Sequence, residues 1–514
     1  MTPRGCLICA PLVARSVSQM LTQMQEAKAN GADVVESRVD HIPGFNAAKD
    51  LPVLLNARTL PMIVTARAKW EGGVYEGEET ERQKLLELAV KLGADYVDIE
   101  LQVARDFIAT LKQNKIVSET KVIVSNHNWE VTPSLHEIGE LVARIQSTGA
   151  DIVKFATTAT NITDVSRVLH LLAHSQVPTI ALVMGPKGVI GRILCPKYGG
   201  YLTFGALRKG QESAPGQPTL ADLSHVYRVG QLGRDTKVFG IIGNPVYHSK
   251  SPILHNAAFE KCSIDAVYVP FLVEDLAEFL SVYSVPDFCG FSVTIPHKEA
   301  ALKCCDEVDP IAKAIGAVNT IVRKSDGKLV GYNTDCDGAL TAIEDGLHES
   351  GLASEGASSP LKDKLFVVIG AGGAGKALAF GARERGARVV IANRNFGRAK
   401  ELADAVGGEA IQLEKLSEFR PETGMVLANS TSIGMQPDIN QSPLPKDALS
   451  AYCLVFDAVY TPRTTKLLRE AAEVGAAVVS GVEMFIRQAY GQFELFTGQP
   501  APKELMREIV MASY

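Results

Sequence analysis

Eight short runs of apolar, mostly β-branched residues constrain the fold of this 514-residue sequence more than any other feature. They lie at Leu7–Val13, Val34–Val39, Met62–Thr65, Tyr96–Leu101, Lys121–Ser125, Ile152–Phe155, Thr179–Val183 and Tyr201–Phe204. Segments with helical spacing of apolar residues, such as Glu79–Leu92 and Ser134–Thr148, lie between them. Eight strands that alternate with helices predict an α/β protein whose residues 1–225 form a closed (β/α)8 TIM barrel.

A glycine-rich turn stands in the second half of the chain. The apolar run Phe366–Ile369 is followed by Gly370, Ala371, Gly372, Gly373, Ala374 and Gly375, and then by a helix-like segment. Strand, turn and helix in this order predict a Rossmann dinucleotide-binding unit. Gly370 permits the tight turn, Gly372 lets the backbone approach a pyrophosphate, and Gly375 lets the helix pack on the strand. The helix N-terminus favours phosphates.

The end of the next predicted strand, Arg388–Ala392, indicates which dinucleotide binds. An NAD enzyme usually has an acidic residue there for the ribose 2′-hydroxyl. This sequence has Asn393 and Arg394 instead, with Arg398 nearby, and basic side chains suit a 2′-phosphate. We therefore expect NADP rather than NAD.

The composition excludes several classes of protein. A hydrophobic content of 46%, a charged content of 21% and a net charge of -6 are ordinary for a globular protein and predict no nucleic-acid or membrane partner. We expect no signal or transit peptide in this sequence. Cys6 and Cys9 lie in a predicted strand whose alternation points them to opposite faces, and no second pair completes a metal site. We expect no metal, and nine reduced thiols that fit a reducing compartment.

Polar residues stand at the ends of the predicted barrel strands, where such barrels carry their chemistry. Lys154 interrupts an apolar strand, and a desolvated neutral amine can attack a ketone to form a Schiff base. His127, on the preceding strand end, would carry protons. Arg38, Arg67 and Arg192 would hold a carboxylate and hydroxyls. The alternatives are an ion-paired or snorkelling lysine, a structural histidine and plain salt bridges.

These motifs together resemble type I 3-dehydroquinate dehydratase over nearly all of residues 5–225. The resemblance rests on Val35–Asp40, Val97–Glu100, Ser125–His127, Val153–Lys154, Gly188–Arg192 and Ser213–Gln217. It implies that Lys154 forms an imine with the ketone of 3-dehydroquinate and that His127 removes a proton and then helps water to leave. It also implies an orienting role for Glu71 and substrate contacts for Glu36, Arg38, Arg67, Arg192, Ser213 and Gln217. Asp98 and Glu100 remain open between supporting the catalytic pair and holding the barrel together.

A polar stretch separates the predicted barrel from a new strand at Val238–Ile242, and we expect a linker at residues 226–236. Ser249 and Ser251 then precede a predicted helix, where they would receive a carboxylate or simply cap the helix. Lys298 and Asp335 each follow an apolar run. Such a pair can handle the proton that accompanies hydride transfer, unless it is only a surface ion pair.

The second half resembles shikimate dehydrogenase over about residues 237–514. The motifs are Asn244-Pro245, Ser249-x-Ser251-Pro, Thr294-x-Pro-x-Lys298, Gly316-Ala-x-Asn319, Asn333-Thr-Asp335, Asn429–Met435 and Asp457-x-x-Tyr460. The resemblance implies that Lys298 and Asp335 are catalytic. It implies shikimate contacts for Ser249, Ser251, Thr294, Asn319, Tyr460, Gln488 and Gln492, and cofactor contacts for Thr431, Met435 and Gly481. Asp337 departs from the family pattern, and it would either tune Asp335 or face water.

The resemblances imply how the second half is divided and what the whole chain does. Residues 237–338 and 484–514, the latter a helical tail, would form a shikimate-binding domain around an NADP-binding domain at 339–483. The chain would convert 3-dehydroquinate to 3-dehydroshikimate and then to shikimate in the shikimate pathway of aromatic amino acid biosynthesis. The alternatives are a fusion to a quinate dehydrogenase and a barrel that only binds. We expect a monomer, and this domain order is typical of plant proteins, which implies the plastid stroma, with the cytosol open.

Overall fold

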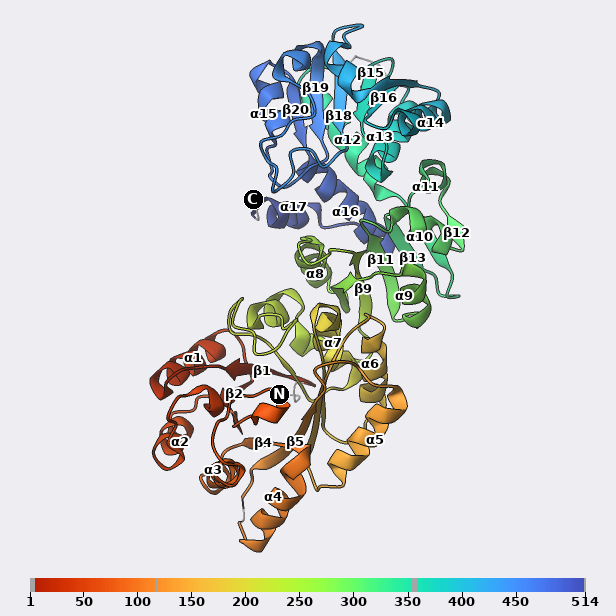
Figure 1. The fold of residues 1–514 in the computed structure, drawn as a ribbon. Helices are drawn as coiled ribbons and strands as arrows, with labels where there is room; N and C mark the ends of the chain where they lie inside the picture. Colours follow the sequence, from red (N-terminus) through yellow and green to blue (C-terminus); the bar gives the residue numbers. More distant parts are fainter. Residues whose placement is uncertain (1–4, 117, 354–357, 513–514) are drawn as a thin grey trace. The chain divides into compact units, whose positions relative to one another are not determined.

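The computed structural model describes residues 5–116, 118–353 and 358–512 of the chain (Figure 1). The chain packs into two compact units. The first contains the N-terminal sheet and its helices together with Asp265–Asp287, which holds β10 (Ala266–Leu272) and α9 (Leu276–Val282). The second contains Phe239–Ile264 and the chain from Phe288 onward.

Eight parallel strands form the sheet of the first unit, as the apolar runs predict. They are β1 (Leu7–Leu12), β2 (Val34–Arg38), β3 (Met62–Thr65), β4 (Tyr96–Glu100), β5 (Lys121–His127), β6 (Ile152–Thr158), β7 (Thr179–Met184) and β8 (Leu202–Phe204). Their order is β7-β6-β5-β4-β3-β2-β1-β8. A backbone hydrogen bond of 2.8 Å from the N–H of Tyr201 to the carbonyl of Thr179 joins the two ends. The sheet is thus a nearly closed barrel, with β1 paired to both β2 and β8.

Helices follow the strands and cover the outside of the barrel (Figure 1). They are α1 (Val17–Ala29), α2 (Ala47–Asn56), α3 (Glu79–Lys91), α4 (Leu101–Gln113), α5 (Leu135–Gln146), α6 (Asp164–His174) and α7 (Val189–Leu194). Local sequence sets where some begin: at α5 the Ser134 side chain accepts from the N–H of Glu137, whose carboxylate accepts from Ser134 in turn. Isoleucines, leucines and valines from the strands fill the interior together with Cys9.

The expected linker contains local structure. A helical turn at Asp222–Val226 precedes it and a short 3₁₀ helix at Val229–Gln231 lies inside it. The sequence is polar there because these turns lie partly exposed, so the apolar periodicity of a longer helix is absent.

The first sheet of the second unit is mixed. Strands β9 (Lys237–Gly243), β11 (Phe288–Val293), β13 (Thr320–Arg323), β14 (Leu329–Tyr332) and β12 (Glu307–Val308) lie in this order. Strand β13 is antiparallel to β11 and β14, whereas β12 is parallel to β14. The helices of this part are α8 (Ser251–Lys261), α10 (Lys298–Cys304), α11 (Pro310–Ile315) and α12 (Thr334–Glu349).

The remaining sheet is parallel, and its strand order is that of a dinucleotide-binding Rossmann fold. The order is β17 (Glu409–Gln412), β16 (Arg388–Asn393), β15 (Leu365–Ile369), β18 (Met425–Asn429), β19 (Tyr452–Asp457) and β20 (Ala477–Ser480). Its helices are α13 (Gly373–Glu384), α14 (Phe396–Val406) and α15 (Lys466–Glu473) (Figure 1). Two apolar clusters, one on each face, bury the strands.

The C-terminal tail is helical, as the sequence predicts. It forms α16 (Gly481–Thr497) and α17 (Lys503–Ala512), separated at Gly498, whose φ of 68° ends α16 in the left-handed region. Gln488 and Gln492 are polar residues of α16. Both are buried, whereas Arg487 forms ion pairs with Asp345 and Glu483.

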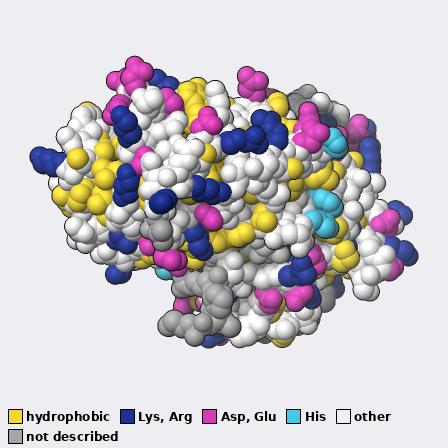
Figure 2. Space-filling view, turned by 90° about the horizontal axis from the view of Figure 1, so that it is seen from below, with side chains coloured by type: hydrophobic (Ala, Val, Ile, Leu, Met, Phe, Trp, Pro, Cys, Tyr) yellow, Lys and Arg dark blue, Asp and Glu magenta, His cyan; other side chains and the backbone are white. Residues whose placement is uncertain are grey.

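The surface mixes charges of both signs. Figure 2 shows Lys and Arg side chains interspersed with Asp and Glu over the face that it displays, with apolar side chains between them. Exposed pairs such as Lys84 with Glu81 contribute to this pattern. In the described part of the chain, no helix combines the length and apolar character that crossing a membrane requires.

Candidate active sites

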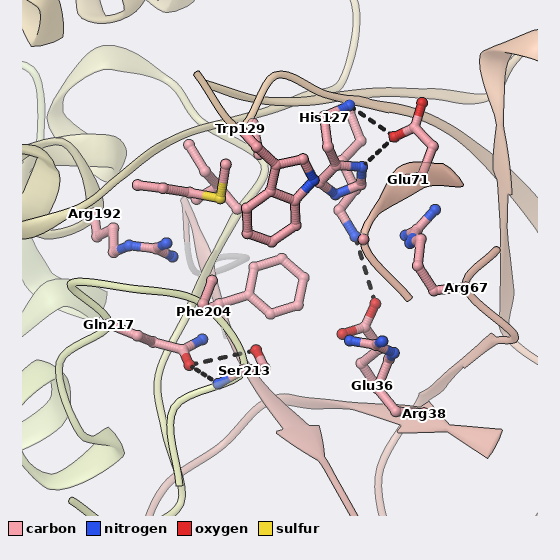
Figure 3. Close-up of a pocket in the computed structure, with 16 residues that line it drawn as sticks. Glu36, Arg38, Arg67, Glu71, His127, Trp129, Arg192, Phe204, Ser213 and Gln217 are labelled. Carbon is pink, nitrogen blue, oxygen red and sulfur yellow. Dashed lines mark hydrogen bonds and ion pairs between the residues drawn. The ribbon is translucent and has the colours of Figure 1, made fainter. Parts of the chain in front are cut away.

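The carboxyl ends of the barrel strands surround a pocket that brings together every residue expected to act on dehydroquinate (Figure 3). The lining residues are Glu36, Arg38, Arg67, Glu71, Gly72, His127, Trp129, Lys154, Ala156, Leu182, Met184, Arg192, Phe204, Ser213, Ala214 and Gln217. They come from the strands β2, β5, β6, β7 and β8, from α7, and from the loops after β3, β5 and β8. Residues distant in the sequence meet because parallel strands end on one side of the barrel.

Lys154 is buried in β6 and paired with two carboxylates. Its Nζ lies 2.6 Å from Asp98 Oδ2 and 3.4 Å from Glu36 Oε1, and 4.9 Å from the centroid of the Phe204 ring. The ion-paired alternative raised by the sequence is therefore correct in this structure. Such pairing does not oppose a covalent role, because the same nitrogen faces the pocket.

Asp98 and Glu100, which the sequence left open, have different partners. Asp98 contacts Lys154 directly, and its Oδ1 lies 2.8 Å from Arg67 Nη2. Glu100 contacts Arg67 at 2.9 Å and Arg82 at 2.6 Å. Asp98 thus supports the lysine, whereas Glu100 joins the pocket arginine to helix α3.

His127 and Glu71 form a hydrogen-bonded pair (Figure 3). Glu71 Oε2 lies 2.7 Å from Nδ1 of His127 and also accepts from its backbone N–H at 2.8 Å. Burial, followed by the positive charges of Arg67 and Lys154, lowers the pKa of His127 well below its ordinary value. Burial also raises the pKa of Glu71 to about 7, although Arg67 opposes it. With Nδ1–H donated to an ionised Glu71, Nε2 is free to accept a proton.

Arg192 is the pocket cation without an acidic partner among the contacts of the described residues. It is 1% exposed, and its Nε has no hydrogen-bond partner there. Burial lowers its pKa to about 10. Arg38, by contrast, forms two hydrogen bonds with Asp40. A buried, unneutralised guanidinium is suited to a carboxylate ligand.

The loop after β8 carries Ser213 and Gln217 at the pocket edge. Gln217 Oε1 accepts from the N–H of Ser213 at 2.9 Å. Gly216 between them has a φ of 72°, and a Cβ there would lie 2.1 Å from the carbonyl of Gly185. A glycine is therefore required for this loop to pack against the end of β7.

The sequence reasoning missed the apolar wall of the pocket. Trp129 stacks on His127 at 6.3 Å between ring centroids and 20° between planes, and the two side chains lie together in Figure 3. Its indole occupies the space that a Cβ on Gly72 would fill, at 2.4 Å. Phe204 and Met184 complete the wall. Their only signal in the sequence was a place near strand ends.

In the second unit, Lys298 and Asp335 meet as expected. Nζ of Lys298 lies 2.6 Å from Asp335 Oδ2, with side chains 23% and 9% exposed. Lys298 begins α10, and Asp335 lies in the first turn of α12, which Asn333 caps through the N–H of Cys336. The pair thus brings together a cation and an anion from the first turns of two helices. The Asp337 side chain faces solvent: it is 70% exposed and forms an ion pair with Arg385 at 3.4 Å.

The other residues expected to contact shikimate differ in the hydrogen bonds that they already make within the protein. The N–H of Ser251 donates to Ser249 Oγ at 3.2 Å. Asn319 Oδ1 accepts from the N–H of Thr334. Gln492 accepts from Ser292 and donates to the carbonyl of Asn319, so its amide is part of a buried network.

Three further residues of this expected set lie on loops and on α16. Thr294 follows β11, and its N–H donates to the carbonyl of Ile242. Tyr460 follows β19 and stacks on Phe485, with ring centroids 5.5 Å apart. The Gln488 side chain donates to the carbonyl of Phe485 at 3.0 Å, which fixes its orientation on α16.

The glycine turn has the geometry that a dinucleotide phosphate needs. Gly370 has a φ of 106°. A Cβ on Gly375 would lie 2.3 Å from the carbonyl of Gly370, so strand and helix approach closely. No heavy atom lies within 4 Å of a Cβ built on Gly372, the cap of α13, and that helix start has no side-chain cap. A Cβ built on Gly373 would lie 3.8 Å from Cδ of Lys298, so the turn lies beside the Lys298–Asp335 pair.

The ends of neighbouring strands supply the rest of the expected cofactor residues. Asn393 ends β16, and Arg398 Nη2 reaches the carbonyl of Ala371 at 3.4 Å. Arg394 follows in the same loop as Asn395, which caps α14. The Arg398 side chain thus lies beside the glycine turn, and Arg394 follows the end of the strand next to β15; basic side chains suit a 2′-phosphate.

A buried network joins the carboxyl ends of β18 and β19, at the same edge of the sheet as the glycine turn. Asn429 Oδ1 accepts from the hydroxyl of Thr431 at 2.7 Å, and its amide donates to Asp457 at 3.0 Å. Met435 follows in the same loop and is 45% exposed. A Cβ on Gly481 would lie 2.5 Å from the carbonyl of Ala458, so α16 starts close to the end of β19. No cluster of potential metal ligands was found among the described residues.

Family comparisons divide the chain in the same order as its sheets. Residues 8–234 match type I 3-dehydroquinase. Residues 241–321 match the shikimate dehydrogenase substrate binding domain, residues 352–441 match shikimate / quinate 5-dehydrogenase, and residues 481–511 match the shikimate 5′-dehydrogenase C-terminal domain.

The chain is similar to curated proteins and to a solved structure. A Bacillus cereus shikimate dehydrogenase (NADP(+)) is 40% identical over 54% of this chain and 98% of its own length. A solved dehydroquinate dehydratase and shikimate dehydrogenase from S. pombe is 27% identical, with 99% of each chain covered and a TM-score of 0.44. The chloroplastic bifunctional 3-dehydroquinate dehydratase/shikimate dehydrogenase of Arabidopsis thaliana is 60% identical over 98% of this chain and 84% of that protein. The chain therefore belongs to the family of bifunctional 3-dehydroquinate dehydratase/shikimate dehydrogenases.

Proposed function

We propose that the barrel converts 3-dehydroquinate to 3-dehydroshikimate through a Schiff base on Lys154. The observation that carries this proposal is the convergence of Lys154, the His127–Glu71 pair and the unneutralised Arg192 on one pocket. Arg192 binds the substrate carboxylate, helped by Ser213 and Gln217. Glu36, Arg38 and Arg67 bind the hydroxyls and the carboxylate end.

The residues divide the proton transfers between them. The Lys154 amine adds to the C3 ketone, and the adduct loses water to give an iminium, which acidifies the C2 proton. Nε2 of His127 takes that proton and then gives it to the C1 hydroxyl, which leaves as water. Hydrolysis of the product iminium releases 3-dehydroshikimate and returns Lys154. Trp129, Phe204 and Met184 limit the access of water to this site.

Reductive trapping tests this half of the proposal. Borohydride added with 3-dehydroquinate should reduce the iminium, and mass spectrometry should find the adduct on the peptide that contains Lys154. Lys154→Ala should remove both the adduct and dehydration. A wild-type enzyme that turns over without any trapped adduct would exclude the Schiff base.

We propose that the second unit reduces 3-dehydroshikimate to shikimate. Ser249 and Ser251 hold the carboxylate at the start of α8, and Thr294, Asn319, Tyr460 and Gln488 surround the ring. Lys298 and Asp335 exchange the proton of the alcohol as hydride is transferred, since their 2.6 Å contact lets one assist the other. Gln492 acts through Asn319, because its amide is already bonded to the carbonyl of that residue.

We propose NADP as the cofactor, which supplies or accepts the hydride when it is bound. The glycine turn Gly370–Gly375 and the start of α13 would hold the diphosphate, and Asn393, Arg394 and Arg398 the 2′-phosphate. Thr431, Met435 and Gly481 would lie along the nicotinamide half. A relative supports this choice, since the Bacillus cereus protein is a shikimate dehydrogenase (NADP(+)).

Replacing the cation at the 2′-phosphate tests the cofactor. Arg394→Gln should raise the KM for NADP by about 10-fold or more, because a charge-assisted hydrogen bond is worth about 1.5–3 kcal/mol. The KM for NAD should change little. Equal effects on the two cofactors would assign Arg394 to another part of the dinucleotide.

The setting of the enzyme follows from its relatives. The likeness to a chloroplastic protein supports the plastid stroma as its compartment. We further propose the domain division at 1–225, 237–338 with 484–514, and 339–483, and a monomeric state. The match over 98% of the chain to a shikimate dehydrogenase fusion disfavours the quinate dehydrogenase alternative and a barrel that only binds.

A further inference from the structure

Asp98 is buried beneath Lys154, outside the set of described residues that line the pocket. Its Oδ2 lies 2.6 Å from Lys154 Nζ, and its Oδ1 accepts from Ser125 Oγ at 2.6 Å and pairs with Arg67 at 2.8 Å. Both oxygens are therefore engaged, and the side chain is 0% exposed. Asp98 has no free face for a substrate hydroxyl, so its contact with the lysine is its route to the chemistry.

Asp98 remains an anion in this setting. Burial works against its ionisation, but the positive charges of Arg67 and Lys154 outweigh it and hold the pKa of Asp98 well below its ordinary value. A carboxylate this acidic does not keep the proton that Lys154 loses before it attacks the ketone. Its contribution is electrostatic.

Schiff-base formation conserves the charge that Asp98 faces. An ammonium and a ketone give an iminium and one molecule of water, so the nitrogen carries one positive charge before and after the step. The new C=N bond replaces the C=O bond, and the departing oxygen leaves as water with two protons from the nitrogen. An anion placed against the ammonium is thus already placed against the iminium, with no reorganisation.

Glu36 is less suited to this task, although it also contacts the lysine. Its Oε1 lies 3.4 Å from Nζ and accepts from the Thr65 hydroxyl at 3.0 Å. Glu36 also faces the pocket, where a substrate hydroxyl competes for it. Asp98 is closer and is not exposed to the substrate.

We propose that Asp98 is the counter-ion of the Lys154 iminium: it holds the lysine in position and favours the cationic Schiff base over its neutral form. The proposal rests on the Schiff base proposed above. It predicts that removal of this charge changes the pH range over which the covalent adduct exists, and not only its amount.

The test compares Asp98→Asn with Glu100→Gln by borohydride trapping with 3-dehydroshikimate from pH 5 to 9. Both variants remove a buried carboxylate of β4 that contacts Arg67, but only Asp98 contacts Lys154. We expect the Asp98→Asn trapping profile to move to lower pH and the adduct at pH 8 to fall about 10-fold. The Glu100→Gln profile should keep its wild-type position.

The outcomes separate the two proposals. Absence of an adduct in the wild type would overturn the Schiff base itself. A wild-type adduct with an unmoved Asp98→Asn profile would overturn the counter-ion alone. If Asp98→Asn does not fold by circular dichroism, Asp98→Ala purified in formate replaces it. Formate, but not chloride at equal ionic strength, should then restore the wild-type profile, and indifference to formate would overturn the proposal.

Discussion

At the scale of single residues, the burial of each site lysine determines how many carboxylate partners it requires. The Lys154 side chain is 5% exposed and contacts two carboxylates, whereas that of Lys298 is 23% exposed and contacts one. A buried charge without a partner is costly, so a lysine deep in a barrel strand requires more compensation than one at the start of a helix. The sequence identified both lysines but left the role of Asp98 open, because its contact with Lys154 joins residues 56 positions apart.

The pairing of His127 with Glu71 predicts the acid limb of dehydration. His127 offers Nε2 as a base only while Glu71 is ionised and accepts Nδ1–H. Because the pKa of Glu71 is raised to about 7, kcat/KM for 3-dehydroquinate should fall as the pH drops through about 7. In Glu71→Gln the limb should move to lower pH, where His127 itself gains a proton, with kcat reduced about 100-fold.

A pH series of initial rates from pH 5 to 9 measures this. Shikimate oxidation by the same variant is the control, and it should be unchanged. An acid limb that stays in place in Glu71→Gln would show that the pair does not set the protonation state of the base.

Helices and strands were predictable from the sequence where one physical signal, such as a run of apolar residues, dominated. The barrel strands are apolar runs, and all eight were found within a few residues of their predicted bounds. Strands β5 and β6 extend to His127 and Thr158, beyond the apolar runs, because polar residues at the pocket still pair in the ladder. The tail was harder, since Gln488 and Gln492 read as polar but are buried through hydrogen bonds. The hydrogen-bond partners of Gln492 are Ser292 and Asn319, which are distant in the sequence and which no local pattern contains.

The ends of β18 and β19 supply a prediction about stability. Asp457 is fully buried and accepts from Asn429, from the N–H of Val459 and from the Thr465 hydroxyl. Burial raises its pKa from the ordinary 3.8 to about 6. The protonated form is thus favoured by folding, so this group's stabilisation is complete below pH 3.8 and is lost as the pH rises to about 6. The loss amounts to about 3 kcal/mol.

Asp457→Asn should remove this pH dependence, since an amide does not titrate and the Thr465 hydroxyl can turn to accept from it. Hydrogen exchange of β19 amides between pH 4 and 6 measures the local free energy of opening. Thr465→Val is the control, because it removes the hydrogen bond to Asp457 together with the cap bond from the N–H of Leu468 and keeps the titrating group. An Asp457→Asn protein with the wild-type slope would assign the slope to another residue.

At the scale of the whole molecule, each unit contains the groups that are proposed to react in its own step. Lys154, His127 and Glu71 lie in the first unit, and Lys298, Asp335 and the glycine turn lie in the second. The two matched families catalyse consecutive steps, so the product of one lysine site is the substrate of the other. The order of the domains could be predicted from the sequence, because each half of the chain carries its own specific motifs.

This division predicts that the activities are separable by single substitutions. Lys154→Ala should abolish dehydration and leave shikimate oxidation within about 2-fold of wild type, and Lys298→Ala should do the reverse, with a loss of about 100-fold or more in oxidation. An equimolar mixture of the two variants should convert 3-dehydroquinate to shikimate with NADPH, after a lag while free 3-dehydroshikimate accumulates. Coupled assays that follow both NADPH and the enone absorbance measure these rates. If either substitution disabled both reactions in a folded protein, or if the mixture made no shikimate, the two sites would not be independent.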